Sequence, residues 1–244
     1  MLIAPVVVAI ATTIERRLGP SAGGWVAALP IGFTVAVAAV MLDSGGHAAA
    51  ELALSAAAHV PEQLCFAVVF ALVMTRRGLR EGFLAGAATY VATAFVLAPV
   101  PPGVLIAASL PAFHLAARAI EDGRPRPGSP PRRITTAMMC AGSAVVVALA
   151  VMTSRLVDPA TAGAVAAFPT VTSTLVLAVA ARDGARAGAH VCAGLTRSLP
   201  CYLTFCLVLV VAEPRVGILA VAAALLGCTV AGGLTWRTVP LPAA

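Results

Sequence analysis

The chain has 244 residues, of which 60% are hydrophobic and only 11% are charged. A soluble domain needs roughly a quarter of its residues charged, so this composition excludes an ordinary soluble protein. The mean hydropathy of +0.98 indicates that lipid surrounds most of the chain. The net charge of +6 comes from arginine alone. Because the arginines lie between apolar segments, they indicate membrane loops rather than a nucleic-acid partner.

Apolar runs of about 20 residues are long enough to cross the hydrocarbon core of a bilayer. In chain order, the runs between charges predict nine such helices, at residues 2–17, 22–42, 47–75, 81–99, 102–119, 134–154, 160–181, 185–212 and 215–236. We therefore expect an all-α, polytopic membrane protein with about nine transmembrane helices. The first helix is short, which leaves open a native start upstream of Met1.

Arginine placement predicts the orientation of these helices. The loops after odd-numbered helices hold most of the arginines. The loops after even-numbered helices hold only Arg155 and Arg215, each near an acidic residue. Cytoplasmic loops carry the excess of arginine, so we expect the N-terminus outside and the C-terminus inside.

The second part of the chain repeats the first at one constant shift in numbering. Three pairs of prolines coincide without a gap: Pro20 with Pro159, Pro30 with Pro169, and Pro61 with Pro200. Prolines are rare enough for one constant spacing to indicate a duplication. Five predicted crossings separate equivalent points, and five is odd, so the second copy should be inverted in the membrane. Inverted repeats of this kind are typical of transporters.

The duplication predicts the domain organisation. Residues 1–99 form the first repeat, with four helices, and residues 134–238 form the second, inverted repeat. Residues 100–119 are the linking fifth helix. Residues 120–133 are rich in proline, glycine and arginine and are expected to be a cytoplasmic linker. The result is a 4+1+4 arrangement.

Each copy places a proline inside its second membrane helix, where it removes a backbone hydrogen bond. Broken helices at symmetric positions are a pointer to a carrier's binding site. Small polar residues follow both prolines, so the expected substrate-binding residues are Pro30, Thr34, Pro169, Thr170, Thr172 and Ser173. The alternative is a simple kink in which the helix's own hydroxyl groups satisfy the backbone.

The third predicted helix carries unusual charges for a membrane segment. Glu51, Ser55, His59 and Glu62 are spaced so that they share one helical face. Ions inside a membrane are costly, so they pair or line a wet cavity. We therefore expect a proton pathway through Glu62, His59 and Glu51. The alternative for Glu51 is a place at the membrane interface.

The matching face of the eighth predicted helix carries His190, Gly194, Ser198 and Cys201, with Arg197 beside it. His190 is a further candidate for proton coupling, with the same interfacial alternative as Glu51. Arg197 is a candidate counter-ion or an anchor for an anionic group of the substrate.

Other conspicuous residues predict packing rather than chemistry. All six cysteines fall in apolar stretches without a CxxC pair, and His114 is interpreted as a packing residue. The aromatic residues Trp25, Tyr90, Tyr202 and Trp236 are interpreted as interface anchors or packing. Motifs for ATP binding, metal-dependent hydrolysis or a serine nucleophile are absent from the sequence. We therefore expect no cofactor, no metal site and no enzymatic activity.

The two segments that run from Gly19-Pro20 through Gly24 to Leu29-Pro30, and from Asp158-Pro159 through Gly163 to Phe168-Pro169, carry a resemblance. With the long charged helix after each, they resemble a family of uncharacterised bacterial inner-membrane proteins with the same duplicated pattern. The resemblance implies a multi-pass protein of the bacterial cytoplasmic membrane and brings no established activity. More loosely, the layout is similar to small inverted-repeat carriers.

Together these features predict a secondary-active transporter, exporter or flippase of a small or lipid-like molecule. The site should lie between the repeats near the two broken helices, and proton coupling is left open. Two alternatives remain: an intramembrane enzyme acting on a lipid-linked substrate, and a passive channel or structural subunit of a membrane complex. The expected partners are the lipid bilayer and the substrate, and homo-oligomerisation is left open.

Overall fold

The computed structural model describes residues 3–120 and 159–239, and every regular element in these two ranges is a helix. The helices are α1 (Ile3–Leu18), α2 (Pro20–Ala27), α3 (Ile31–Ser44), α4 (Gly46–Ala58), α5 (Val60–Arg77), α6 (Leu79–Leu97), α7 (Pro102–Ile120), α9 (Pro159–Ala167), α10 (Thr170–Asp183), α11 (Ala185–Val216) and α12 (Leu219–Trp236). The all-α prediction is confirmed for this part of the chain. The predicted helix 134–154, and all but the first residue of the predicted linker 120–133, lie outside the described residues.

Six segments of the described chain are long and apolar enough to cross a membrane: Pro20–Ser44, Gly46–Arg77, Pro102–Ile120, Gly163–Asp183, Ala185–Val216 and Leu219–Trp236. The chain is therefore a multi-pass membrane protein, as its composition predicts. Two of the predicted spans within the described residues fall outside this set. The first, α1, has only 16 residues, and α6 begins with the charged pair Arg80 and Glu81.

Two of the six segments are broken at the prolines that the sequence singled out. Pro30 lies between α2 and α3 as the N-cap of α3, and Pro169 lies between α9 and α10 as the N-cap of α10. Proline lacks the N–H that would bond to the carbonyl four residues earlier. At the first break Leu29 N donates to Val26 O instead, at 3.2 Å, and Phe168 N makes the matching bond to Val165 O at 3.3 Å.

A third break separates α4 from α5 at His59, two residues before Pro61. The sequence predicted one continuous helix there. The matching proline of the second half, Pro200, lies inside α11, which continues unbroken for 32 residues. The two halves therefore differ at the position of the charged face.

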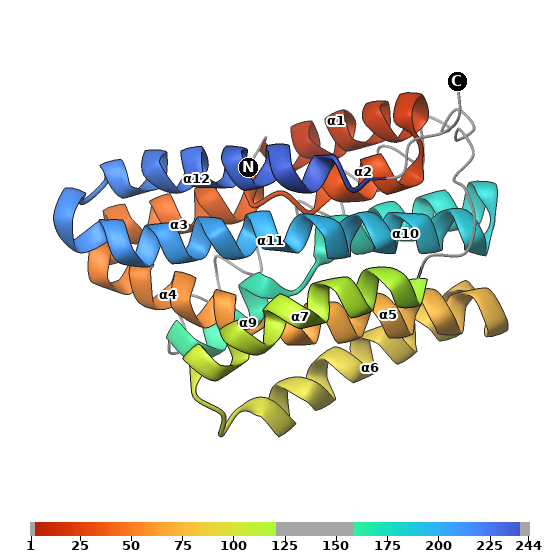
Figure 1. Ribbon diagram of the computed structural model, residues 1–244, viewed down its shortest axis with the longest axis horizontal. Helices are drawn as coiled ribbons and strands as arrows, with labels where there is room; N and C mark the ends of the chain where they lie inside the picture. Colours follow the sequence, from red (N-terminus) through yellow and green to blue (C-terminus); the bar gives the residue numbers. More distant parts are fainter. Residues whose placement is uncertain (1–2, 121–158, 240–244) are drawn as a thin grey trace.

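The helix bounds recur at the same constant shift that relates the prolines. The matching starts and ends are Pro20 and Pro159, Ile31 and Thr170, Ser44 and Asp183, Gly46 and Ala185, Arg77 and Val216, and Leu97 and Trp236. The turns match as well: Gly45 and Gly184 both have φ 91°, a left-handed conformation that favours glycine. Figure 1 shows matching helices running in opposite directions, since α5 runs from left to right in that view and α11 from right to left.

Each short helix before a proline break packs tightly on a helix of the other half. A Cβ added at Gly24 of α2 would overlap the backbone carbonyl of Val191 in α11. A Cβ added at Gly163 of α9 would overlap the side chain of Ser55 in α4. Gly24 and Gly163 are separated by the same shift in numbering as the three pairs of matching prolines. These exchanged contacts interlock the two halves around α11, which crosses the middle of the molecule in Figure 1.

Candidate functional site

A cavity of about 970 Å³ opens between α4, α5, α6, α7 and α9. Most of its lining is apolar. The described lining residues are Glu51, Leu54, Ser55, Ala58, His59, Glu62, Tyr90, Val91, Ala94, Phe95, Leu97, Ala98, Val100, Pro102, Leu105, Ala164, Val165, Phe168 and Thr170. The structure thus brings the whole predicted polar face of the third span to one cavity.

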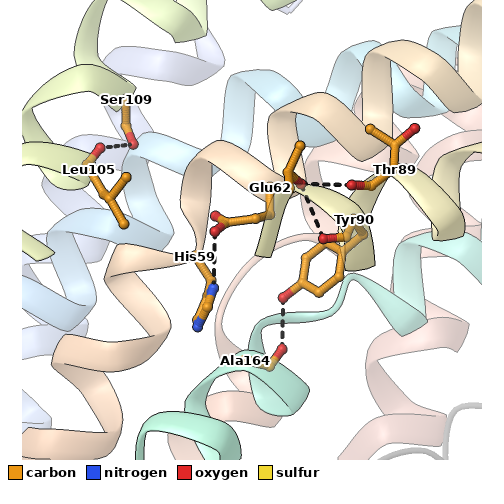
Figure 2. Close-up of polar contacts among 8 residues, drawn as sticks. His59, Glu62, Thr89, Tyr90, Leu105, Ser109 and Ala164 are labelled. Atoms are coloured by element: carbon orange, nitrogen blue, oxygen red, sulfur yellow. Dashed lines mark hydrogen bonds and ion pairs between the residues drawn. The ribbon is translucent and has the colours of Figure 1, made fainter. Parts of the chain in front are cut away.

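Glu62 is the most deeply buried polar group of this cavity. Its side chain has no exposed surface, whereas His59 beside it is 18% exposed. The break at His59 places the imidazole one turn before Glu62, and Nδ1 lies 3.2 Å from Glu62 Oε1 (Figure 2). Glu62 Oε2 has no hydrogen-bond partner among the described residues. A buried carboxylate with one unsatisfied oxygen is costly, so a hydrogen-bond donor or a positively charged group of a ligand would be stabilised at this oxygen.

Two aromatic residues stand beside this carboxylate on the cavity wall. Tyr90 of α6 donates its hydroxyl hydrogen to Ala164 O at 2.7 Å, which fixes its ring against α9 (Figure 2). Phe168 packs against Tyr90 with ring centroids 5.1 Å apart and an interplanar angle of 89°. The sequence interpreted Tyr90 as an anchor or a packing residue, and did not single out Phe168 as a site residue.

Glu51 marks the mouth of the cavity. Its side chain is 49% exposed and lies 3.2 Å from His47 Nε2, which is 90% exposed. Glu51 lies in α4 and Glu62 in α5, on opposite sides of the break at His59. Glu51 therefore lies at the surface, in agreement with the interfacial alternative, while Glu62 lies at the closed end.

A smaller cavity of about 100 Å³ lies where the two proline breaks meet. Pro30, Pro169, Thr170 and Thr172 line it, together with Gln63 of α5. Both cavities share Val165, Phe168 and Thr170 as lining residues. The point where the two broken helices meet therefore adjoins the larger cavity that contains Glu62.

The remaining hydroxyls of the predicted site serve the backbone. Thr34 Oγ1 donates to Pro30 O at 2.7 Å, and Ser173 Oγ donates to Pro169 O at the same distance. Thr34 and Ser173 thus stabilise the starts of α3 and α10, as the kink alternative describes. Thr170 and Thr172 are left as the polar lining at the breaks.

The matching face of α11 is covered by α2 instead of a cavity. His190, Arg197, Ser198 and Cys201 are all buried, and none of them lines either of the two cavities. A Cβ added at Gly194 would overlap the backbone oxygen of Ser21 in α2. The structure therefore separates Arg197 and His190 from the Glu62 cavity.

Trp25 occupies the position on α2 that corresponds, at the constant shift in numbering, to the position of Ala164 beside the Glu62 cavity. Its Nε1 donates to Thr235 Oγ1 at 3.2 Å, and the Thr235 hydroxyl lies 3.2 Å from Cys201 Sγ. At the constant shift that separates the matching prolines, Cys201 corresponds to Glu62, and Ala164 corresponds to Trp25. A large ring thus occupies the position where the other half has only a methyl group. Comparing the two copies residue by residue would have revealed this difference in the sequence.

A buried ion pair joins α1 to α10 outside the cavities. Arg182 Nη2 lies 2.7 Å from Glu15 Oε1 and 2.6 Å from Asp183 Oδ2. Glu15 is fully buried and packs against Gly23 of α2. The sequence assigned Arg182 to a cytoplasmic loop and did not predict its partner.

Within residues 3–120 and 159–239, no group of three or more His, Cys, Asp or Glu residues is arranged to hold a metal ion. Comparisons of the chain with protein-family models, with curated proteins and with solved structures give no match.

Proposed function

We propose that the protein is a secondary transporter, working as an exporter or flippase, with the Glu62 cavity as its substrate site. The observation that carries the proposal is a fully buried carboxylate with one unsatisfied oxygen, at the closed end of a cavity of about 970 Å³ in a multi-pass membrane protein. Ionisable groups inside membranes mark substrate or proton pathways by default. The volume is at the upper end for small-molecule sites, which span about 300–1,000 Å³.

The inverted repeat of 4+1+4 helices belongs to this proposal. It is supported by the helix bounds that recur at one constant shift and by the opposite directions of α5 and α11. An orientation with the N-terminus outside and the C-terminus inside fits the contact of Arg182 with Glu15. This contact brings together the ends of α1 and α10, which both precede predicted cytoplasmic loops.

Alternating access follows from the difference between the halves. In the proposed orientation the Glu62 cavity opens to the outside, past Glu51 and the turn between α6 and α7. Trp25 and Trp236 close the matching path at the inside. If each inverted half adopted the conformation that the other half has now, the outer cavity would close and an inner cavity would open along α11. The buried polar groups of α11, including His190 and Arg197, would then line the inner path.

Proton coupling assigns Glu62 as the carrier of the proton. A carboxylate with one free oxygen in an apolar cavity can hold a proton or a cationic group. His59 on the other oxygen can relay the proton towards Glu51 and the mouth. Substrate binding and protonation would then exclude each other at one atom, which is the requirement for exchange.

The test is proton movement in proteoliposomes that contain a pH-sensitive dye. Compounds from a metabolite and drug library are added outside, and we expect at least one class to drive proton flux in the wild-type protein. The flux should be lost in Glu62→Gln and kept in Glu81→Gln, a matched substitution of an exposed carboxylate at the start of α6. Equal flux in both variants contradicts the proposal. Movement of a compound across the membrane without proton flux favours a passive channel. Turnover of a lipid by the purified protein favours the enzyme alternative.

A further inference from the structure

We propose that the cavity selects lipophilic organic cations, with an ammonium or phosphonium centre held at Glu62 and an apolar body in the rest of the cavity. This inference rests on the proposed function for its role in transport, but the binding site itself can be tested without transport.

The charge of the cavity favours a cation. Its described lining includes two carboxylates, Glu51 and Glu62, one imidazole, His59, and no arginine. His59 occupies only Oε1 of Glu62, so Oε2 is available to a positively charged group of a ligand. In a low-dielectric site an anionic ligand would meet an uncompensated carboxylate, whereas a cation completes the pair.

The aromatic side chains of the cavity lining also favour a positively charged ligand. Tyr90 and Phe168 line the cavity together with Glu62. Cations bind to aromatic rings through the ring quadrupole, and desolvated sites strengthen the attraction. Because the hydroxyl of Tyr90 is committed to Ala164 O, its ring is held in place before any ligand arrives.

The rest of the cavity requires a large apolar body. The side chains beyond the carboxylate are Leu54, Val91, Phe95, Leu97 and Leu105. A bare metal ion would leave this surface unfilled. A cavity of about 970 Å³ is instead suited to a drug-sized molecule.

The same geometry predicts that cation binding displaces a proton. When Glu62 is protonated, the arriving cation takes the place of that proton on the carboxylate, and the proton leaves to water, so charge is conserved. The titratable groups around Glu62 are His59 and Cys65 from its own segment, Tyr90 from α6, and Glu51 at the mouth. The described lining from α7 and α9 adds no titratable group. Affinity for the cation should therefore rise as the pH is raised.

The experiment uses the full-length protein in detergent and two probes of nearly equal shape and opposite charge. Equilibrium dialysis measures binding of tetraphenylphosphonium and tetraphenylborate. We expect the phosphonium to bind more tightly at higher pH and to release protons in a weakly buffered solution, and the borate not to compete with it. Glu62→Gln should weaken phosphonium binding roughly 10- to 100-fold, the usual effect of removing a charged partner. Glu81→Gln should leave it unchanged.

A second variant keeps the test valid where Glu62→Gln fails to fold. Ala94→Trp fills the cavity without changing its charge and should also weaken phosphonium binding. Equal binding of both probes, or wild-type phosphonium affinity in folded Glu62→Gln, overturns the inference. If the phosphonium does not bind but another compound drives Glu62-dependent proton flux, the cation class is wrong and the transporter stands. If the phosphonium binds at Glu62 but no compound drives proton flux in proteoliposomes, the cation site stands and the transporter proposal is wrong.

Discussion

Trp25 of α2 packs edge to face on Trp236 at the end of α12, with ring centroids 5.0 Å apart and an interplanar angle of 71°. Trp25 donates a hydrogen bond to the Thr235 hydroxyl, which in turn contacts Cys201, so this pair lies over Cys201. The corresponding position in the other half is Ala164, which borders the open cavity of Glu62. One side chain thus accounts for much of the difference between an open and a closed half.

Trp25→Ala should open the covered side. Removing the ring leaves a void above Thr235, so water and small reagents should reach Cys201, which is fully buried in the wild-type chain. Mass spectrometry after N-ethylmaleimide treatment should find Cys201 modified at least tenfold faster in the variant. Leu84→Ala, at an exposed position of α6 that lines neither cavity, is the control and should not change the rate. An unreactive Cys201 in Trp25→Ala would show that other groups close this half.

The interlocked short helices should not tolerate side chains at their contact glycines. Gly163→Ala places a methyl group against Ser55, and Gly24→Ala places one against the Val191 carbonyl. Overpacking of this kind costs about 1–3 kcal/mol, seen as a lower melting temperature in detergent. Gly233→Ala should be harmless, since a Cβ there meets no atom within 4 Å.

Rescue distinguishes the two glycines. Ser55→Gly should restore much of the stability of Gly163→Ala, because the overlapping atoms belong to the Ser55 side chain. No side-chain substitution can relieve Gly24→Ala in the same way, because its obstacle is backbone. Equal melting temperatures for Gly163→Ala with and without Ser55→Gly would refute the α4–α9 contact.

The ion pair between α1 and α10 should contribute strongly to stability. Glu15→Ala leaves Arg182 with Asp183 alone and removes a buried partner. Breaking a buried pair costs about 3–5 kcal/mol when the remaining charge is left unpaired, and less than that here because Asp183 still contacts Arg182. Thermal unfolding monitored by circular dichroism should show a large loss for Glu15→Ala. The control Glu81→Ala removes an exposed carboxylate and should change the melting temperature little. Similar curves for the two variants would mean that the pair contributes nothing.

The sequence was most informative where one residue type has a local effect on the backbone. Proline cannot donate a hydrogen bond, so the breaks at Pro30 and Pro169 were predictable, and the spacing of Glu51 and Glu62 on one helix predicted their shared face. The break at His59 was not predictable in this way. Pro61 follows this break by two residues, and its counterpart Pro200 lies in an unbroken helix, so the surroundings decide the outcome.

The candidate site was only half predictable for a physical reason. Helical spacing gives the face of a residue but not what covers that face. Arg197 and Glu62 look alike as charges within apolar helices, yet α2 packs over the region of α11 around Arg197, and a cavity adjoins Glu62. The tertiary neighbours Tyr90 and Phe168 come from other helices, and no local pattern marks them. The family resemblance and the number of nine spans stay predictions.

In the proposed mechanism, two inverted halves give access to one polar pathway from opposite sides. The most direct test of this mechanism uses a variant with all six cysteines replaced and a single new cysteine at Ser55 or at Ser198. The reagent is a membrane-impermeant maleimide, applied to right-side-out and inside-out vesicles. We predict that Ser55→Cys is labelled only from the outside and Ser198→Cys only from the inside, and that tetraphenylphosphonium protects Ser55→Cys. Labelling of both positions from the same side would contradict the account.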